Sequence, residues 1–450
     1  NYLGFTLHGD YTYNRILRAS ANVAADATSA SGTDASRLAI FPSGGITFLA
    51  ANTGVLPTWI DKLNVSLDAS LSGNSRFSSN YGKNYYTTSN FFSIGAIKRS
   101  NVPNTKLTWE KNRQLDLALD FGMLGNRINL GVNLFSNYAY DLLLNSNISK
   151  VYGSTYYYEN SGEISGKGVE VSLRVNPVHT HDFDVVLGAT LSTVKNTLKK
   201  LGESSFEEIK FSDYNGDDAE VIMQVGSNPY EFYGYQTNGI YTTTAEAQEA
   251  KLTNASGKSY EAGDVRFVDQ NHDGVINSYD KVSIGKATPD IYGGVNLMLR
   301  YRQVSLDANF GYCVGNKAYN ATRRLLESMS AFYNQSTAVL NRWQVEGQQT
   351  SIPRAAYGDP SGNNIFSDRW IEDASYFKLR SLKLAYTFGK VFSFVRSGNV
   401  YVAAENLFTI TKYTGTDPEF AYCYAACMRG FDYGKLAQPV TVKLGFNLNF

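Results

Sequence analysis

The sequence predicts an all-β protein: an antiparallel transmembrane β-barrel that carries long extracellular loops. Three observations predict this class. Apolar and polar residues alternate along many segments of about ten residues, and the connections between these segments alternate between short and long. The chain is also rich in aromatic residues, at 14%, and poor in charged ones, at 18%. Soluble proteins carry roughly 25% charged residues, so the composition departs from that of an ordinary soluble chain.

The clearest alternation is VTVKLGFNLNF, residues 440–450. Its apolar and aromatic residues, from Val440 to Phe450, fall on one face, and its Thr, Lys, Gly and Asn residues fall on the other. At about 10–11 residues this segment has the length of a membrane-crossing strand, whereas soluble strands average about 5–6. In similar segments the polar face carries Asn, Ser, Asp, Arg and Lys, as a water-filled lumen requires.

We count thirteen such segments along the chain. They lie at residues 1–13, 16–25, 39–49, 61–72, 112–121, 128–138, 166–175, 183–194, 290–301, 304–312, 376–388, 398–409 and 439–450. Little helix is expected. Only residues 320–346 have helical composition, and they lie in a connection.

The connections segregate by length. Short ones lie at 14–15, 50–60, 122–127, 176–182, 302–303 and 389–397, and long ones at 26–38, 73–111, 139–165, 195–289, 313–375 and 410–438. Outer-membrane barrels have short periplasmic turns and long external loops. We therefore expect a bacterial outer-membrane location, with 195–289 and 313–375 extracellular and the C-terminus periplasmic.

Thirteen is an odd number, so the first and last strands run in the same direction and cannot pair antiparallel. Bacterial single-chain barrels have even strand numbers, and an open edge in lipid would leave backbone groups without hydrogen bonds. We therefore expect residues 1–450 to form part of a larger barrel. The remaining strands would come from an upstream segment or from another chain.

Other features exclude classes of function. Lys and Arg together number 41, as do Asp and Glu, so the net charge is zero, and we expect no nucleic-acid partner because phosphate binding requires a basic surface. No run approaches the roughly 18 apolar residues of a transmembrane helix, and no signal peptide is recognisable. No GxSxG or phosphate-loop motif occurs, so we expect no enzyme. Cys423 and Cys427 could form a disulfide or be small loop residues, because spacing does not decide between these.

The stretch FVDQNHDGVINSYD, residues 267–280, has the pattern of a calcium loop. An EF-hand loop has oxygen ligands at positions 1, 3 and 5, a Gly at 6, a backbone carbonyl at 7 and an acid at 12. The candidate ligands are Asp269, Asn271, Asp273, Val275 and Asp280, with Gly274 at position 6 and Asn277 at position 9. The sequence leaves two interpretations open: a structural Ca²⁺ clip, or a metal-free polar hairpin held by Asx turns. The flanking segments read as strands, which excludes a calmodulin-type switch.

Two other groups are weighed in the same way. His179 and His181 lie in a predicted short turn, and because zinc sites need three or four ligands, ordinary turn residues are the favoured interpretation. Tyrosine-rich stretches lie in the predicted external loops, at 80–92 and 150–160. Their rings could stack on sugars, contact peptide or pack loops together, and packing is favoured because such loops must cover one another.

Several segments resemble the SusC/RagA family of TonB-dependent outer-membrane transporters. They are LTWEKNRQLDLALDFGML (107–124), ENSGEISGKGVEVSL (159–173), the acidic loop within GDVRFVDQNHDGVINSYDKVSIGKATPDIYGGVNL (263–297), RWQVEGQQTSIPR (342–354) followed by EDASYFKLRSLKLAYTF (372–388), ENLFTITKYTGTDPE (405–419), and the C-terminal strand ending in Phe450. The matches occur in family order from about residue 40 to the end. Residues 16–38 fit the family pattern only loosely.

The resemblance implies a barrel of twenty-two strands, of which this chain would be the C-terminal part. The family's plug domain and TonB box are not recognisable here. The resemblance also implies uptake of glycans or peptides with a SusD-like surface lipoprotein, energised by TonB acting on a plug outside this chain. Lipid bilayer and lipopolysaccharide would surround the strands.

Two alternatives belong to other classes. One is a SusC-like barrel that serves as a non-transporting structural scaffold in a larger outer-membrane protein complex. The other is a soluble calcium-dependent adhesin or lectin, which the strand length and the terminal Phe disfavour.

Overall fold

The computed structural model describes residues 2–92, 94–149, 151, 156–202, 208–212, 218–390, 395–420, 422 and 425–450. The chain divides into two compact units. The first comprises residues 1–209, 224–229 and 295–302, and the second comprises residues 210–223, 230–294 and 303–450. No helix in the described part of the chain is long and apolar enough to cross a membrane.

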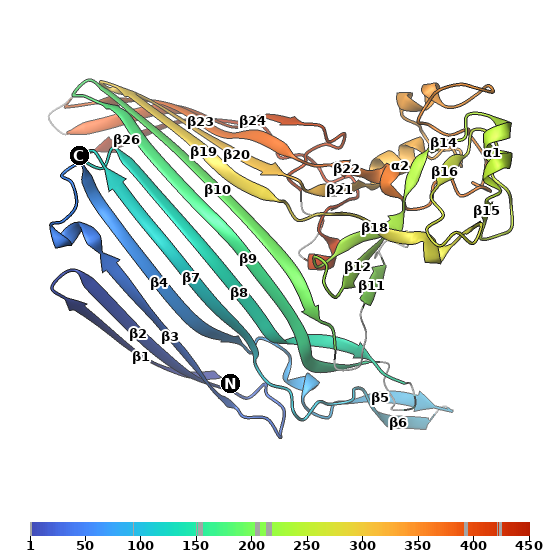
Figure 1. Ribbon diagram of the computed structural model, residues 1–450, viewed down its shortest axis with the longest axis horizontal. Coiled ribbons are helices and arrows are strands. Elements are labelled where there is room, and N and C mark those ends of the chain that lie inside the picture. The colour runs from blue at the N-terminus through green and yellow to red at the C-terminus, as the bar shows by residue number, and fades with distance from the viewer. Residues whose placement is uncertain are drawn as a thin grey trace. The chain divides into compact units, whose positions relative to one another are not determined.

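All thirteen predicted strands are confirmed. They form one antiparallel sheet in the order β1-β2-β3-β4-β7-β8-β9-β10-β19-β20-β23-β24-β26. Their bounds are β1 Tyr2–Tyr13, β2 Leu17–Thr28, β3 Leu38–Leu49, β4 Ile60–Asn74, β7 Glu110–Met123, β8 Ile128–Asn147, β9 Tyr156–His179, β10 Phe183–Lys200, β19 Ile291–Tyr301, β20 Val304–Val314, β23 Tyr376–Phe388, β24 Ser397–Thr411 and β26 Thr441–Asn449. Within the first unit, β4, β7, β8, β9 and β10 run side by side as long ribbons (Figure 1).

The strand register keeps the two faces of the sheet chemically distinct. Between β4 and β7, Leu67 pairs with Leu117 and the next pair is Asp68 with Asp116. Successive residues of a strand point to opposite faces, so one face is apolar and the other polar.

The apolar face is exposed rather than buried. On β26, Leu444 is 78% exposed and Phe446 73% exposed, and Leu7 on β1 is 77% exposed. A soluble sandwich or barrel would turn this face inward to form its core, whereas a membrane barrel presents it to lipid. The predicted fold class is therefore confirmed.

The β8–β9 hairpin is longer than predicted. The sequence predicts strands at 128–138 and 166–175, but β8 has 20 residues and β9 has 24, so the predicted 139–165 connection shrinks to 148–155. The alternation is broken where the pairing register shifts, between Ala139 and Leu143. A bulge of this kind interrupts the alternation of apolar and polar residues without ending the hydrogen-bonded ladder. The alternation therefore predicts strands that are shorter than β8 and β9.

The structure has less helix than the composition of residues 320–346 indicates. In the segment 320–346 only α2, Ala321–Glu327, is an α-helix, and a 3₁₀ turn covers Thr337–Asn341. The side chain of Asn320 caps the start of α2 by accepting the Arg323 N–H at 2.9 Å. Met329 adopts a positive φ of 49°, a conformation that cannot continue a right-handed helix.

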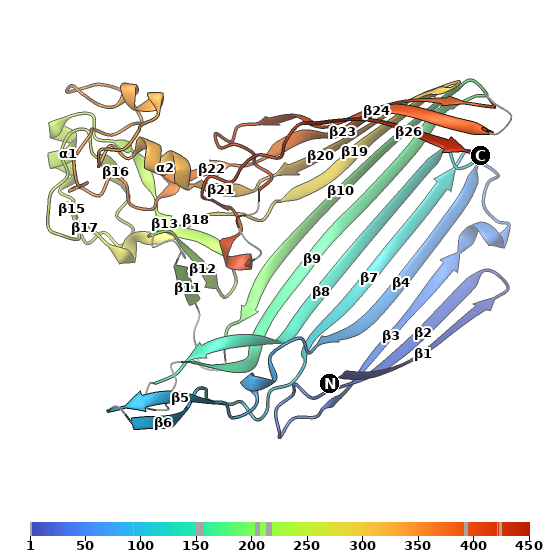
Figure 2. The same cartoon turned by 180° about the vertical axis from the view of Figure 1, so that it is seen from behind.

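The described parts of three connections in the second unit fold together, and we call residues 218–223, 230–290, 315–375, 412–420, 422 and 425–437 the loop domain. Its elements are β12 Glu220–Gln224, β13 Glu231–Tyr235, β14 Thr237–Ile240, α1 Thr244–Ala250, β15 Thr253–Asn254, β16 Val265–Phe267, β17 Val275–Ile276, β18 Lys281–Lys286, β21 Lys317–Asn320, α2, β22 Ile371–Asp373 and β25 Phe431–Asp432. Figure 2 shows the same elements from behind. In the first unit, β5 Tyr86–Phe91 and β6 Ile94–Arg99 form a hairpin between β4 and β7.

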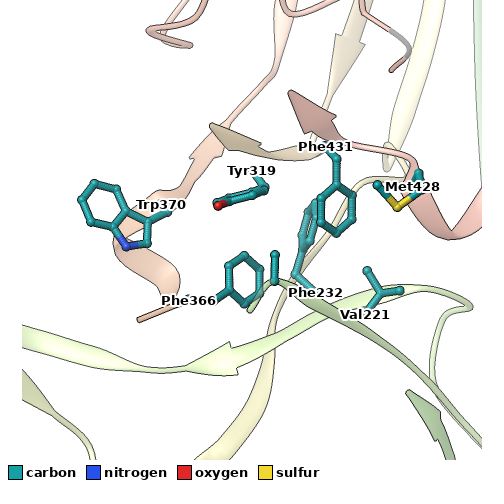
Figure 3. Packing of buried hydrophobic residues seen from close by; sticks show 8 residues of the cluster. Val221, Phe232, Tyr319, Phe366, Trp370, Met428 and Phe431 are labelled. Carbon is teal, nitrogen blue, oxygen red and sulfur yellow. The ribbon is translucent and has the colours of Figure 1, made fainter. Parts of the chain in front are cut away.

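One buried core joins all three connections. Phe232, Tyr319, Phe366 and Phe431 are each at most 1% exposed and belong to one cluster with Trp370. Figure 3 shows these rings gathered around Tyr319, which meets Phe366 edge-on at 5.0 Å between ring centroids. The loops therefore have the packed interior of a folded domain.

Candidate functional site

The acidic loop lies between β16 and β18 of the loop domain. Phe267 at its start and Ile276 within it are 2% and 3% exposed and belong to a second buried cluster with Tyr260. β17 pairs parallel with β15 through Thr253 and Val275. The start of the loop and residues 275–276 within it are therefore fixed by packing and by backbone pairing.

The carboxylates of the loop accept backbone N–H groups. Asp269 accepts the His272 N–H at 2.7 Å through Oδ1 and the Gly274 N–H at 2.9 Å through Oδ2. Gly274 has a φ of +82°, which a glycine adopts without strain. These are the hydrogen bonds of an Asx-type turn.

The centre of the loop is held by Asp273. Its Oδ1 accepts the Val275 N–H at 2.8 Å, and its Oδ2 accepts the Asn271 Nδ2–H at 2.9 Å. The backbone hydrogen bond from Val275, with that from the Asn271 side chain, lowers the pKa of Asp273. Asp273 is thus held ionised by the loop itself.

Asp280 closes the loop and is fully buried. Its Oδ1 accepts the Gln270 N–H at 2.9 Å and its Oδ2 the Asn277 N–H at 2.8 Å. The side chain of Asp280 therefore bridges the first and last turns of the loop, which is the position of the twelfth ligand in the calcium pattern.

The structure brings the five predicted ligands into one compact loop, but it uses their oxygens internally. The Val275 carbonyl accepts the Asn277 Nδ2–H at 3.0 Å, and Asn271 Oδ1 accepts the Asp273 N–H at 3.1 Å. Among the residues that the structure describes, no three His, Cys, Asp or Glu side chains form a group that could hold a metal ion. Binding Ca²⁺ would need several of these oxygens to exchange an N–H for the ion, so calcium stays a prediction.

A buried ion pair fixes the loop domain beside this loop. Asp264 is fully buried and accepts the Arg354 Nε–H at 2.8 Å and the Asn363 Nδ2–H at 3.0 Å. Asn363 in turn accepts the Val265 N–H at 2.8 Å. The sequence did not predict this set, since Arg354 and Asn363 follow Asp264 by 90 and 99 residues.

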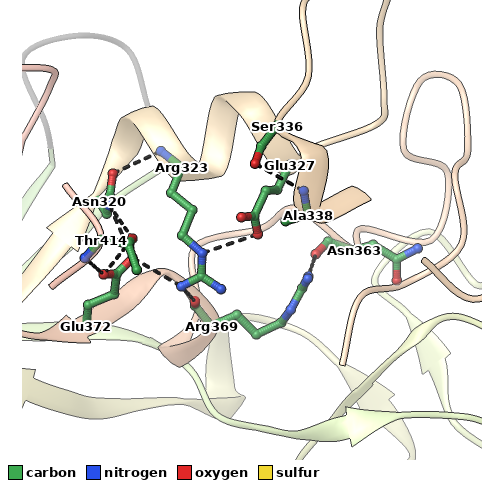
Figure 4. A network of polar contacts seen from close by, with 9 residues as sticks. All are labelled: Asn320, Arg323, Glu327, Ser336, Ala338, Asn363, Arg369, Glu372 and Thr414. Atoms are coloured by element: carbon green, nitrogen blue, oxygen red, sulfur yellow. Dashed lines mark hydrogen bonds and ion pairs between the residues drawn. The ribbon is translucent and has the colours of Figure 1, made fainter. Parts of the chain in front are cut away.

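A second polar network surrounds α2 (Figure 4). Arg323 donates to Glu327 and to Glu372, each at 3.2 Å, and Glu372 also accepts the Thr414 N–H at 2.8 Å. Arg369 donates to the Asn363 carbonyl at 2.8 Å, and burial lowers its pKa to about 10. This network joins two connections of the loop domain with hydrogen bonds.

His179 and His181 each lie beside an aspartate carboxylate. His179 Nδ1 lies 2.9 Å from Asp184, and His181 Nδ1 lies 2.9 Å from its neighbour Asp182. These contacts are those expected of ordinary polar turn residues.

The tyrosine-rich stretches pack on each other. Tyr81 stacks on Tyr158 with 3.7 Å between ring centroids, and Tyr156 meets Tyr158 edge-on at 5.9 Å. The packing alternative thus describes these rings. Cys423, which could form a disulfide with Cys427 or be a small loop residue, lies outside the described residues, and Cys427 packs against the core around Tyr319.

No family model matches the chain, but individual proteins do. TonB-dependent receptor P3 of Formosa agariphila is 29% identical over 439 residues, covering 92% of this chain and 42% of the receptor. TonB-dependent receptor SusC of Bacteroides thetaiotaomicron is 27% identical over 382 residues, covering 82% of this chain and 34% of that protein. The chain thus spans less than half the length of these relatives.

The chain is therefore similar to TonB-dependent receptors along most of its length, and the predicted resemblance to the SusC/RagA family is confirmed. Among solved structures, the RagAB peptide transporter is similar over 100% of this chain and 48% of its own, with a TM-score of 0.82 and 24% identity. The RagAB importer in its open-open state gives a TM-score of 0.84 at the same identity. These likenesses show the fold, and the predicted antiparallel barrel fold is confirmed. The TonB-dependent relatives indicate the outer membrane.

Proposed function

We propose that this chain is the barrel part of a TonB-dependent receptor that imports glycans or peptides across the outer membrane. The observation that carries the proposal is the match of 92% of the chain to a TonB-dependent receptor, on a sheet whose apolar face is exposed as lipid contact requires. The relatives are receptors and transporters, so no enzymatic activity is proposed.

The orientation follows from the connections. The turns at 14–16, 124–127, 180–182 and 302–303 are short, whereas those at 75–109, 201–290, 315–375 and 412–440 are long. Barrels of this class turn tightly on the periplasmic side and carry their long loops outside. We place the loop domain outside the cell and Phe450 on the periplasmic side.

The partners we propose are a SusD-like surface lipoprotein and TonB, which would act through a plug and TonB box outside residues 1–450. The loop domain supports the first partner because it exposes aromatic side chains. Phe332 is 94% exposed and Tyr357 75% exposed, with 5.3 Å between their ring centroids. Clustered exposed apolar side chains are typical of protein-binding surfaces.

The experiment compares uptake in isogenic cells with and without TonB, each expressing the full-length receptor that contains this chain. Labelled oligosaccharides and labelled peptides are offered separately. Uptake of one ligand class should require both the receptor and TonB. If the receptor is present in the outer membrane and neither class enters in a TonB-dependent way, the non-transporting scaffold replaces the transporter.

A further inference from the structure

The apolar face of the sheet changes character towards the long connections. Between β7 and β8, Leu117 pairs with Leu134, and the next pair on the same face, closer to the long connection that precedes β7, is Leu115 with Ser136. The two leucines of β7 are 43% and 49% exposed. Because residues paired across strands share a face, these pairs follow the apolar face outward from the middle of the strands to the point where polar residues replace apolar ones.

Two lysines stand directly opposite each other on this face. Ser136 on β8 pairs with Lys167 on β9, and Lys167 pairs with Lys195 on β10. Both lysines are exposed, and neither forms an ion pair within the described part of the chain. Opposed residues of a sheet have their Cβ atoms about 5 Å apart, and like charges there destabilise the pair. An anion held between the two ammonium groups removes this repulsion.

Arg113 adds a third basic side chain to the same face. It pairs with Tyr138 on β8, and its guanidinium carbon lies 5.5 Å from the centre of the Tyr138 ring. Arg113 is exposed and has no ion-pair partner among the described residues. We call Arg113, Lys167 and Lys195 the basic rim.

Nearby charges on these strands are already paired, in contrast to the basic rim. The ammonium group of Lys111 on β7 lies 2.9 Å from the Asp141 carboxylate. Glu163 on β9 accepts a hydrogen bond from the Tyr138 hydroxyl. The three bases of the rim are thus left to interact with groups outside the described chain.

The basic rim lies at the level where the hydrocarbon core of a membrane ends. Lys195 follows Phe183, the first residue of β10, by about twelve residues, and a tilted strand crosses the hydrocarbon core in about 9–11 residues. Tyr138 and Tyr140 share the same face of β8, with 6.0 Å between ring centroids. Membrane barrels carry such aromatic girdles where lipid meets water. The rim therefore lies just beyond the apolar band, on the side of the long connections.

We propose that the basic rim binds the phosphate groups of lipid A, the lipid anchor of lipopolysaccharide in the outer leaflet. Phosphate oxygens accept charge-assisted hydrogen bonds from Lys and Arg side chains, and basic groups at a membrane surface attract anionic headgroups. A phosphate between Lys167 and Lys195 separates two like charges. The site goes beyond the uptake function and takes no transported ligand, but it rests on the proposed orientation, because lipid A lies in the outer leaflet.

An acidic protein surface fits the same face less well. The rim continues without interruption into the exposed leucines at 115 and 117, which in a membrane barrel contact lipid. An amphipathic molecule with a phosphate above and acyl chains below matches both parts of this face at once.

The test is binding of lipid A to the full-length receptor, purified in detergent, freed of bound lipid and studied by native mass spectrometry. The probes are bis-phosphorylated lipid A, the same lipid A after dephosphorylation, and inorganic phosphate. Phosphorylated lipid A should bind, and the dephosphorylated form should bind at least about tenfold more weakly, as expected when charge-assisted hydrogen bonds are lost. Inorganic phosphate should not displace lipid A, because only lipid A also contacts the apolar residues.

The variants test the named residues. The Lys167→Gln, Lys195→Gln double variant should bind phosphorylated lipid A about tenfold more weakly, and Arg113→Gln about threefold more weakly. Replacing both lysines by Arg should preserve binding, because the charges remain. The matched control is Arg174→Gln. Arg174 is an exposed base that pairs with Asn129 on the polar face of β9, and its loss should change binding less than about twofold.

Thermal unfolding gives a second readout of the opposed lysines. Lipid A should raise the unfolding temperature of the unmodified receptor, because a ligand that binds the folded state stabilises it, and it should raise that of the double Gln variant much less. Without lipid A, the double Gln variant should unfold at a temperature no lower than the unmodified receptor, since the substitutions remove a repulsion. The altered migration of unheated barrels on SDS gels shows that each variant is folded.

The proposal is overturned if dephosphorylated lipid A binds as tightly as the phosphorylated form, if inorganic phosphate displaces lipid A, if the double Gln variant binds like the unmodified receptor, or if Arg174→Gln weakens binding equally. A double Gln variant that keeps lipid A but loses a SusD-like lipoprotein from the complex would assign the rim to a protein partner instead. Absence of TonB-dependent uptake would overturn the transporter function and leave the lipid A site intact, because its binding needs no uptake.

Discussion

Asp280 is the residue on which the acidic loop closes. Its buried carboxylate accepts two backbone N–H groups, from Gln270 and Asn277. Asp280→Ala leaves both donors without an acceptor, which should destabilise the loop by about 2–4 kcal/mol. Faster amide hydrogen exchange at residues 268–281 would report it. Asp280→Asn keeps one acceptor and should lose less, and the exposed Glu249→Ala should change nothing. Equal exchange in all three variants would contradict the bridging role.

Asp273 makes the loop sensitive to acid. Its pKa is lowered in the fold, first by the Val275 N–H and then by the Asn271 side chain. Because this pKa is lower in the folded loop than in the unfolded chain, ionised Asp273 stabilises the folded loop. This stabilisation is fully present above the unfolded pKa of about 4 and is lost as the pH falls through the folded pKa. Protection of residues 269–277 from hydrogen exchange, corrected for intrinsic rates, should hold at pH 7 and fall below about pH 4. In Asp273→Asn this change should be smaller, and an identical acid response would exclude Asp273 as its source.

Calcium occupancy is tested at the same residues. If Asp269, Asp273 and Asp280 ligate Ca²⁺, chelation should speed limited proteolysis between residues 267 and 281, and added Ca²⁺ should reverse it. The Asp269→Asn, Asp273→Asn double variant should lose that response. If neither the chelator nor the double substitution changes the cleavage rate, the loop is held by Asx turns alone.

At the scale of elements, the pair Arg354–Asp264 fastens the segment 342–363 to β16. Arg354→Ala would leave the fully buried Asp264 carboxylate without its cation. Breaking a buried pair in this way costs about 3–5 kcal/mol. Hydrogen exchange should rise on both sides of the contact, at 261–267 and 352–363.

Arg342→Ala is the matched control for Arg354, because the Arg342 side chain donates to the Val339 carbonyl, at 3.3 Å, and not to a buried carboxylate. It should change exchange only near itself. A similar response to both variants would mean that the Asp264 contact does not fasten the segment.

The elements also show what a sequence can predict. The thirteen strands were predictable because alternation is local and repeats over the whole width of a membrane. The ends of β8 and β9 were not, because bulges at Ala139–Leu143 break the period while pairing continues. α1 was missed, although Thr243 and Glu246 form a capping box, a signal that the spacing of Thr and Glu contains.

The sites divide in the same way. The acidic loop was predictable because its candidate ligands lie within twelve residues of each other. The Asp264–Arg354 contact was not, since it joins residues that lie 90 positions apart in the sequence.

At the scale of the whole molecule, the decisive property is that the apolar residues of the long strands are exposed, the reverse of their burial in a soluble protein. The long strands expose their apolar residues, while the packed cores lie in the loop domain around Tyr319 and around Val265. Lipid would cover the exposed apolar residues of the strands, and water would surround the loop domain. A chain folded in this way needs the membrane for its sheet and an aqueous space for its loops.

The central claim is that the strands cross the outer membrane with the long connections outside. Its most direct measurement is labelling of single cysteines by a membrane-impermeant maleimide in intact cells, with Cys313, Cys423 and Cys427 replaced by Ser. Ser256→Cys, in the loop domain, should be labelled in intact cells. His181→Cys, a fully exposed residue in the β9–β10 turn, should be labelled only after the outer membrane is permeabilised. Labelling of residue 181 in intact cells, or protection of residue 256, would contradict the account.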